Sequence, residues 1–111
     1  MATISNLYVD AGATYSNIIT VTASNGQALN LTGYTVASQM RKSYQSSTAY
    51  AFTASVYDAS NGKIRLQLTD TASAAIPAGR WLYDVEITSG SGTKTRVVEG
   101  IVTVNPQITQ I

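Results

Sequence analysis

Apolar and polar residues alternate along most of this chain, and this alternation constrains the fold more than any other feature. Between residues 80 and 88, every second side chain is apolar, at Trp81, Tyr83, Val85 and Ile87. Successive side chains of an extended strand point to opposite faces, so such a segment is typical of a half-buried strand. Seven segments predict strands, the first of them weakly, at residues 3–9, 18–23, 34–41, 50–57, 63–69, 80–88 and 94–104.

Turn-forming residues separate these segments. Asn25-Gly26 and Asn61-Gly62 are typical of type I′ turns, in which both central residues need a positive φ. We therefore expect Asn61-Gly62 to join the strands before and after it as antiparallel neighbours. A Gly/Ser-rich loop at residues 89–93 has the length of a hairpin loop between the last two long strands.

A short helical turn is predicted at residues 69–75, before the penultimate strand. Thr69 or Asp70 would cap it, because side-chain oxygens accept the free N–H groups at a helix start, and Pro77 would end it. Tyr83 follows soon after this turn. That position resembles the tyrosine corner of sandwich domains, in which the hydroxyl bonds back to the turn.

Seven short strands with regular turns predict an all-β fold. The crossover turn before the penultimate strand favours an immunoglobulin-like Greek-key sandwich of about seven antiparallel strands, with a small barrel or a jelly roll as alternatives. We expect one domain over residues 1–111, with an extended C-terminal tail at residues 105–111. The predicted structural core contains Val36, Phe52, Leu66, Trp81, Tyr83 and Val85.

The register of the last hairpin has two solutions in the sequence. One pairs Glu86 with Arg96, which places opposite charges face to face. The other buries Val98, Val102 and Val104 and sets Gly100 opposite Tyr83. A bulge at Gly100 would reconcile the two patterns.

The composition excludes most catalytic and metal-binding chemistry. The chain has no histidine and no cysteine, which removes the commonest general base, the commonest metal ligand and all thiolate sites. Asp84 and Glu86 share a strand face about 7 Å apart, a separation that resembles an inverting glycosidase. Acids on a solvent-facing strand more often pair with arginine or water. We therefore expect no enzymatic activity, no catalytic residue, no metal and no cofactor.

The charge distribution argues against nucleic-acid and membrane partners. Only 12% of the residues are charged and the net charge is +1, whereas binding to polyanions needs a concentrated basic surface. Arg41-Lys42 beside Tyr44 is the single local basic-aromatic cluster in the sequence. The start of the chain lacks the features of a secretory signal, and no apolar run approaches the ~18 residues that span a bilayer. We expect synthesis in a cytoplasm and a surface that is largely covered in a protein assembly.

Candidate docking elements are the tyrosines and the two ends of the chain, where residues 1–10 are weakly patterned. Exposed tyrosines serve protein interfaces or sugar stacking, and Tyr44, Tyr50 and Tyr57 are the candidates. Pro106 ends the hydrogen-bond ladder of the last strand. Ile108 and Ile111 follow it, and so small a core has no place for them. We expect this tail to run extended onto a neighbouring subunit.

Two segments carry a resemblance to a known family. They are Gly-Arg-Trp-Leu-Tyr-Asp-Val-Glu-Ile at residues 79–87 and Thr-Lys-Thr-Arg-Val-Val-Glu-Gly-Ile-Val-Thr-Val at residues 93–104. Together they resemble immunoglobulin-like domains in virion proteins of tailed phages, especially myophages of cyanobacteria. More loosely, they are similar to the N-terminal domain of upper baseplate proteins. Residues 31–34, 40–43 and 52–58 fit the same pattern, so the resemblance covers most of residues 18–109.

The resemblance implies a non-enzymatic structural role in the virion, with no cofactor. The expected partners are other virion proteins and further copies of the chain in a symmetric assembly. Many such domains are fused to fibre segments, so a chain of this length favours a tail or baseplate subunit or adaptor. A capsid decoration protein on the head is an alternative. A carbohydrate-binding module for host-surface glycans is an alternative of another class.

Overall fold

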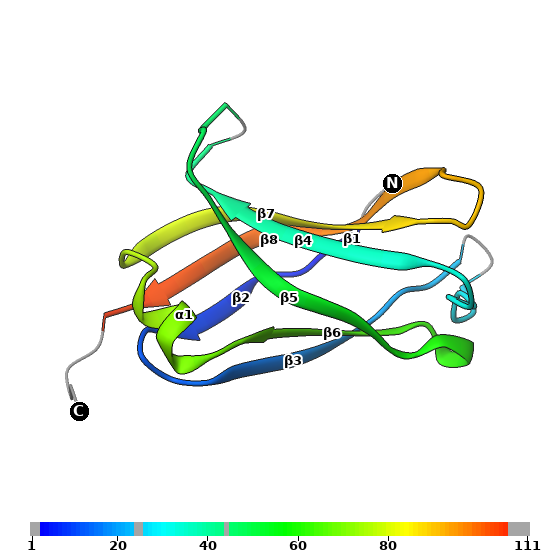
Figure 1. The fold of residues 1–111 in the computed structure, drawn as a ribbon, viewed down its shortest axis with the longest axis horizontal. Helices are drawn as coiled ribbons and strands as arrows, with labels where there is room; N and C mark the ends of the chain where they lie inside the picture. The colour runs from blue at the N-terminus through cyan, green and yellow to red at the C-terminus, as the bar shows by residue number, and fades with distance from the viewer. Residues whose placement is uncertain (1–2, 24–25, 44, 107–111) are drawn as a thin grey trace.

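The computed structural model describes residues 3–23, 26–43 and 45–106 (Figure 1). Beside the strands there is a 3-10 turn η1 (Ala59–Asn61) and one short helix α1 (Asp70–Ala74). The described residues form eight strands, namely β1 (Thr3–Ile4), β2 (Leu7–Asp10), β3 (Tyr15–Thr20), β4 (Thr35–Arg41), β5 (Ala49–Asp58), β6 (Lys63–Leu68), β7 (Gly79–Thr88) and β8 (Lys94–Asn105).

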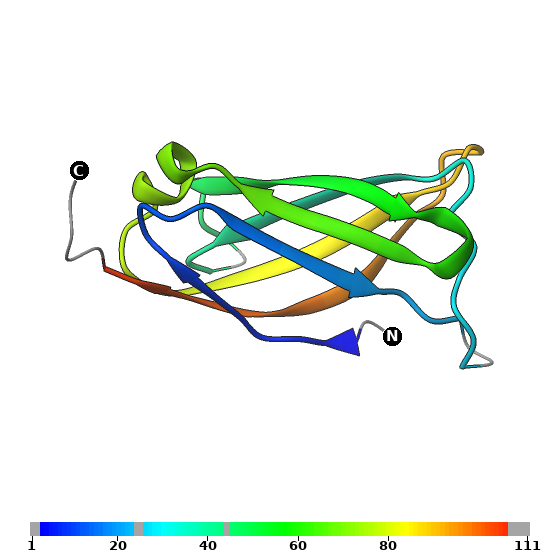
Figure 2. The ribbon, with the colours of Figure 1, turned by 90° about the horizontal axis from the view of Figure 1, so that it is seen from below.

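The strands form two sheets that face each other across the core (Figure 2). Sheet A contains β1 and β2 at its edge, then β8, β7, β4 and the first part of β5, whereas sheet B contains the rest of β5, β6 and β3. Strand β5 belongs to both sheets, because Phe52 lies opposite Ser38 and the next residue, Thr53, lies opposite Gln67. This crossing strand closes one side of an immunoglobulin-like sandwich.

The first strand differs from the prediction of a wholly antiparallel fold. Strands β1 and β2 both run parallel to β8, with Ile4 opposite Glu99 and Leu7 opposite Val102. The remaining strand pairs are antiparallel. The predicted strand at 3–9 is also split in two at Ser5 and Asn6.

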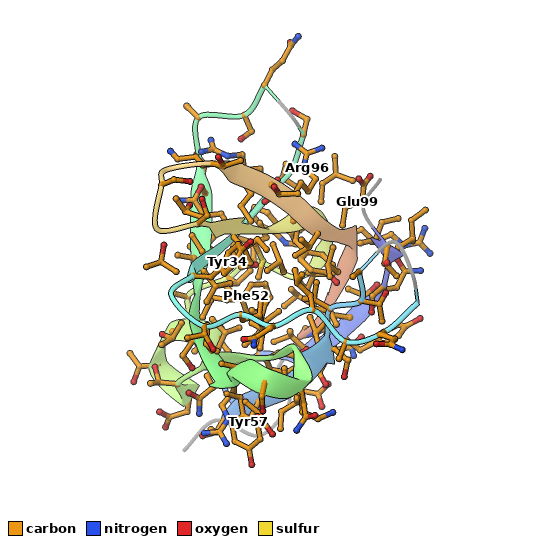
Figure 3. All side chains as sticks on the ribbon, turned by 90° about the vertical axis from the view of Figure 1, so that its right-hand side faces the viewer. Tyr34, Phe52, Tyr57, Arg96 and Glu99 are labelled. Carbon is orange, nitrogen blue, oxygen red and sulfur yellow. The ribbon has the colours of Figure 1, made fainter. Side chains whose placement is uncertain are left out.

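The inward row of each strand builds the core. The predicted core residues Phe52, Leu66, Trp81, Tyr83 and Val85 are buried, and Val36 is half-buried against them. The aromatic rings pack edge to face: the centroid of the Phe52 ring lies 6.1 Å from the centroid of the Tyr83 ring. In the view of Figure 3, Tyr34 and Phe52 lie in the interior between the two outer faces.

The turn at Asn61-Gly62 joins β5 and β6 as expected, but it is not a type I′ turn. Only Gly62 has a positive φ, of 67°, and Asn61 ends the 3-10 turn η1. The Asp58 carboxylate accepts hydrogen bonds from Asn61 Nδ2 at 2.9 Å and Ser60 Oγ at 3.2 Å, which favours this longer turn. The hydrogen bond from Asn61 is the main reason that the pKa of Asp58 is lowered. The other turn has a positive φ at Gly26, whereas Asn25 lies outside the described residues.

Helix α1 is capped by Thr69, whose Oγ1 accepts a hydrogen bond from the Ala72 amide at 3.1 Å. On the inner side of the helix, the buried Ser73 hydroxyl accepts from the Gly12 amide at 3.0 Å and donates to the Ala13 carbonyl at 2.8 Å. These bonds tie the link between β2 and β3 to helix α1, about 60 residues further along the chain.

The expected tyrosine-corner bond is made by a different residue. Trp81 Nε1 donates to the Pro77 carbonyl at 3.0 Å and so reaches back to the turn. The Tyr83 hydroxyl donates instead to the backbone carbonyl of Ser5. The reason is the register, since Tyr83 lies opposite Gly100 and its ring extends past that glycine toward the edge strand.

Both registers proposed for the last hairpin occur together. Glu86 lies opposite Arg96, and Tyr83 lies opposite Gly100. They are reconciled by a bulge, but it falls at Val97 rather than at Gly100, because the register shifts between Val85 and Glu86. The strand also extends through Asn105, which pairs with Asp10 and so belongs to β8 rather than to the tail.

Candidate docking surfaces

The outer face of sheet A is hollowed into a groove of about 540 Å³. Its floor comes from the outward-facing side chains of β4, β7 and β8, and β1 forms one wall. These strands are remote in sequence and are brought together by the order β1-β8-β7-β4. The groove is lined by Ile4, Asn6, Gln39, Arg41, Ser43, Leu82, Tyr83, Asp84, Glu86, Arg96, Glu99, Gly100 and Ile101.

The charged side chains of the groove are largely paired with one another. Arg96 Nε lies 3.1 Å from Asp84 Oδ2, and Arg96 Nη1 lies 4.0 Å from Glu99 Oε2. Arg41 donates to the Ser46 carbonyl at 2.6 Å. For Glu86, no ion pair occurs within the described part of the chain. The groove thus holds Asp84, Glu86 and Glu99, three of the six acidic residues of the chain, against two arginines.

Apolar side chains cross the same groove. Leu82 and Ile101 are cross-strand neighbours on β7 and β8, and Ile101 is 37% exposed. Ile4 on β1 is 74% exposed, the highest value among the large apolar residues described. Two exposed isoleucines and the half-buried Leu82 beside paired charges are consistent with a protein-docking surface, in which the apolar contacts supply affinity and the charges supply orientation.

The outer face of sheet B carries a second, smaller patch. Tyr57 on β5 is 52% exposed, and the Arg65 guanidinium lies over its ring at 4.3 Å from the centroid. Ile18 on β3 is 43% exposed and lies opposite Arg65. The buried Arg65 Nε has no hydrogen-bond partner among the residues that the structure describes. Figure 3 shows Tyr57 on one side of the molecule and Arg96 and Glu99 on the other.

Those predicted docking residues that the structure describes do not form one patch. Tyr57 is exposed on sheet B, whereas Tyr50 is half-buried with its ring edge-on to Trp81 at 5.3 Å. Pro106 is exposed directly after β8. Tyr44, Ile108 and Ile111 lie outside the described residues. Within the basic-aromatic cluster, Lys42 Nζ lies over the Trp81 ring at 4.6 Å, so this cation serves the fold.

Sequence reasoning missed the groove residues Leu82 and Ile101, and it covered Ile4 only as part of the N-terminal end, residues 1–10, without singling it out. Each is an apolar residue in an outward position of its strand, which the alternation alone would assign to solvent. The available signal was this exception to the pattern: Leu82 interrupts the polar row formed by Arg80, Asp84 and Glu86. An apolar residue in a polar row indicates a covered outer face.

Three hydrogen bonds from Ser5 and Asn6, which we call the latch, hold the chain after β1 against β7 and β8. The Ser5 carbonyl accepts from the Tyr83 hydroxyl, the Ser5 amide donates to the Glu99 carbonyl at 2.9 Å, and the Asn6 Oδ1 accepts from the Ile101 amide at 3.1 Å. Burial raises the pKa of Tyr83 to about 12, although the hydrogen bond to Ser5 acts in the opposite direction. Burial likewise raises the pKa of Tyr15.

The latch predicts a loss of stability in strong alkali. Above pH 10 the unfolded chain loses the Tyr83 proton, whereas the folded chain keeps it until about pH 12. The unfolded state then binds fewer protons, so the free energy of unfolding falls across this window, by about 2–3 kcal/mol for Tyr83. Denaturant unfolding at a series of pH values measures this change. The free energy of unfolding of Tyr83→Phe should fall less between pH 10 and 12 than that of the unmodified protein, and the fall that is left in the variant comes from Tyr15. Equal slopes in the two proteins would contradict the assignment.

The described residues contain neither a cluster of acidic, histidine or cysteine side chains that could hold a metal ion nor a helix that could cross a membrane. No group of three or more metal-ligating side chains is placed to hold an ion within residues 3–23, 26–43 and 45–106. No helix in these ranges is long and apolar enough to cross a membrane. The chemistry available in the groove is that of paired charges and apolar contacts.

Comparisons with known proteins bear on the fold. No protein-family model matches the sequence, and no curated protein matches it. Among solved structures, the N-terminal domain of phage TP901-1 ORF48 is similar, with a TM-score of 0.59 and 17% sequence identity over 91% of this chain and 85% of that one. At this identity the likeness shows a shared fold.

Two further structures match more weakly. One comes from photo-crosslinking work on the cell-adhesive interactions of VGSC beta subunits, with a TM-score of 0.47 and 11% identity over 92% of each chain. The other contains the N-terminal four Ig domains of Dscam1, with a TM-score of 0.41 and 16% identity over 95% of this chain and 23% of that one.

Proposed function

We propose that this protein is a non-enzymatic structural subunit of a bacteriophage virion, associated with the tail or baseplate, that acts by docking onto other protein subunits. The observation that carries the docking role is the groove on sheet A. It combines exposed Ile4 and Ile101 with a paired arginine, Arg96, on a rigid sheet. The phage placement is supported by the fold shared with the TP901-1 domain and by the sequence resemblance of residues 79–87 and 93–104.

The alternatives are a capsid decoration protein and a glycan-binding module. Sugar stacking needs an exposed aromatic ring in or beside the binding cleft. Among the described residues that line the groove, the one aromatic side chain is Tyr83, whose ring is buried, and the exposed Tyr8 lies on the same face of sheet A but outside that lining. The groove therefore favours a protein partner over a sugar.

Incorporation into particles tests this proposal. Ile101→Asp places a charge at the centre of the apolar contact, and we expect it to reduce the copies per particle by at least about tenfold, since burying an unpaired charge costs several kcal/mol. Truncation after Pro106 tests the predicted docking role of the C-terminal tail in the same assay. The matched control is Thr93→Asp, which adds the same charge in the exposed loop between β7 and β8. Copy number is measured by quantitative mass spectrometry of purified particles.

Two outcomes would overturn the proposal. One is a protein absent from purified particles even without any substitution. The other is specific binding of the free protein to a glycan array together with that absence, which would favour the carbohydrate-binding alternative. Detection on the head rather than the tail, by electron microscopy of labelled particles, would replace the tail placement with capsid decoration.

A further inference from the structure

The exposed large apolar side chains are confined to the two outer faces of the sandwich. Ile4, Tyr8 and Ile101 lie on sheet A, and Ile18 and Tyr57 lie on sheet B. These are the large apolar residues that the described part of the chain leaves exposed. The two faces point in opposite directions, so both can be covered at once only by two different neighbours.

The two faces also differ in charge. The groove on sheet A has three acids, Asp84, Glu86 and Glu99, against Arg41 and Arg96, a net charge of −1. Outside the groove, Arg80 and Lys94 lie near the two ends of the same sheet. The outward positions of sheet B carry Lys63 and Arg65 and, within the described β3, β5 and β6, no acid except Asp58 at the end of β5.

We infer that the groove of sheet A receives the outer face of sheet B from a second copy of this chain. The inference rests on the proposed docking function and names its partner. In this contact Arg65 and Tyr57, residue types enriched at interface hot spots, meet the apolar strip of the groove. Arg65 approaches Glu86, the groove acid for which the described residues show no ion pair. The occupant is a second copy because its surface has the complementary charge and the matching apolar patch.

The geometry of this contact is head to tail. Each copy uses sheet A toward one neighbour and sheet B toward the other, and such heterologous contacts produce closed rings or open filaments. Three strands about 4.8 Å apart and six to ten residues long present roughly 300–500 Å². This area is below the roughly 800 Å² per partner of a standard interface. We therefore expect weak, concentration-dependent association of the free protein.

A charge-swap experiment tests the contact. Glu86→Lys makes sheet A of one copy repel the basic sheet B of the next copy, and Arg65→Glu makes sheet B of one copy repel the acidic groove of the next. Each variant alone should therefore associate at least about tenfold more weakly than the unmodified protein. An equimolar mixture should recover association, because every contact then alternates a basic face with an acidic one. Sedimentation velocity of the full chain over a concentration series at low ionic strength supplies the measurement. Ser91→Lys, in the loop between β7 and β8, controls for a change in total charge.

The outcomes are distinct. Failure of the mixture to recover association would overturn the inference, and so would a chain that stays monomeric at the highest concentration. Weakening by Glu86→Lys with no effect of Arg65→Glu would indicate a symmetric contact between two copies of sheet A and would also overturn it. Circular dichroism checks the fold of each variant, and Lys63→Glu replaces Arg65→Glu if the latter does not fold. The proposed function and this inference can fail separately. If the Ile101→Asp protein is lost from particles but the unmodified free chain never self-associates, the proposed function stands and this inference is wrong.

Discussion

Replacing Gly100 with alanine should destabilise the fold by about 3 kcal/mol, because a methyl group at this position would collide with the backbone of the edge strand. A Cβ on Gly100 would overlap the Ser5 carbonyl oxygen and lie 2.9 Å from the carbonyl carbon. These are backbone atoms, held by the hydrogen bonds of the latch, so they cannot turn aside. The edge strand would have to move away, and Tyr83 would lose its partner. Urea denaturation measures the change in the free energy of unfolding.

Gly90→Ala is the matched control for this prediction. It adds the same methyl group to an exposed glycine in the loop between β7 and β8, where the nearest atom is 3.8 Å away. We expect a change within about 0.5 kcal/mol. If Gly100→Ala were as stable as Gly90→Ala, the close approach of Ser5 would not occur in solution. The groove would then have no fixed wall.

Replacing Gly62 with alanine should cost about 3–4 kcal/mol, for two reasons that add. The φ of 67° is unfavourable for a residue with a side chain, which costs about 1–2 kcal/mol. In addition, the new Cβ would lie 2.6 Å from the Val21 carbonyl oxygen and 2.8 Å from that of Leu29. Both oxygens are held beside Gly62 by backbone hydrogen bonds. The Val21 amide donates to the Gly62 carbonyl at 2.7 Å, and the Leu29 amide donates to the Val21 carbonyl at 2.9 Å.

Gly26→Ala separates the two contributions. Its φ is 85°, comparable to that of Gly62, but no atom lies within 4 Å of the added Cβ. We expect Gly26→Ala to cost only the conformational strain of about 1 kcal/mol, so the difference between the two variants measures the steric collision. Thermal unfolding followed by circular dichroism measures both. Equal losses would show that the backbone at Val21 and at Leu29 yields freely.

The local part of the fold could be predicted because it depends on short-range rules. The alternation in residues 80–88 and 63–69 located β7 and β6, since one strand face must be buried. Thr69 was among the two predicted caps because a hydroxyl can satisfy a free amide three residues later. The type I′ turn at Asn61-Gly62 was wrong, because Asp58 stabilises a longer turn that a dipeptide rule does not consider.

The candidate site could not be predicted in the same way. Ile4, Leu82 and Ile101 come from three strands, and whether they meet depends on the register between strands. The register of β7 and β8 was open in the sequence, since two registers fitted it and a bulge at Gly100 was expected to reconcile them, whereas the structure has the bulge at Val97. Of the tyrosines suggested as docking residues, Tyr57 is exposed and Tyr50 packs on Trp81, because alternation gives the face of a residue but not what covers that face.

The sequence by itself determined that the chain forms strands, which side chains face inward along most of them, and that the chain contains no histidine and no cysteine. These properties follow from residue types and from a period of two. Only the tertiary structure decided that β1 and β2 run parallel to β8, that Gly100 leaves room for the Tyr83–Ser5 hydrogen bond, and that an acidic apolar groove and a basic patch lie on opposite faces. Each of these depends on pairing between segments far apart in the chain, and a linear pattern does not specify that pairing.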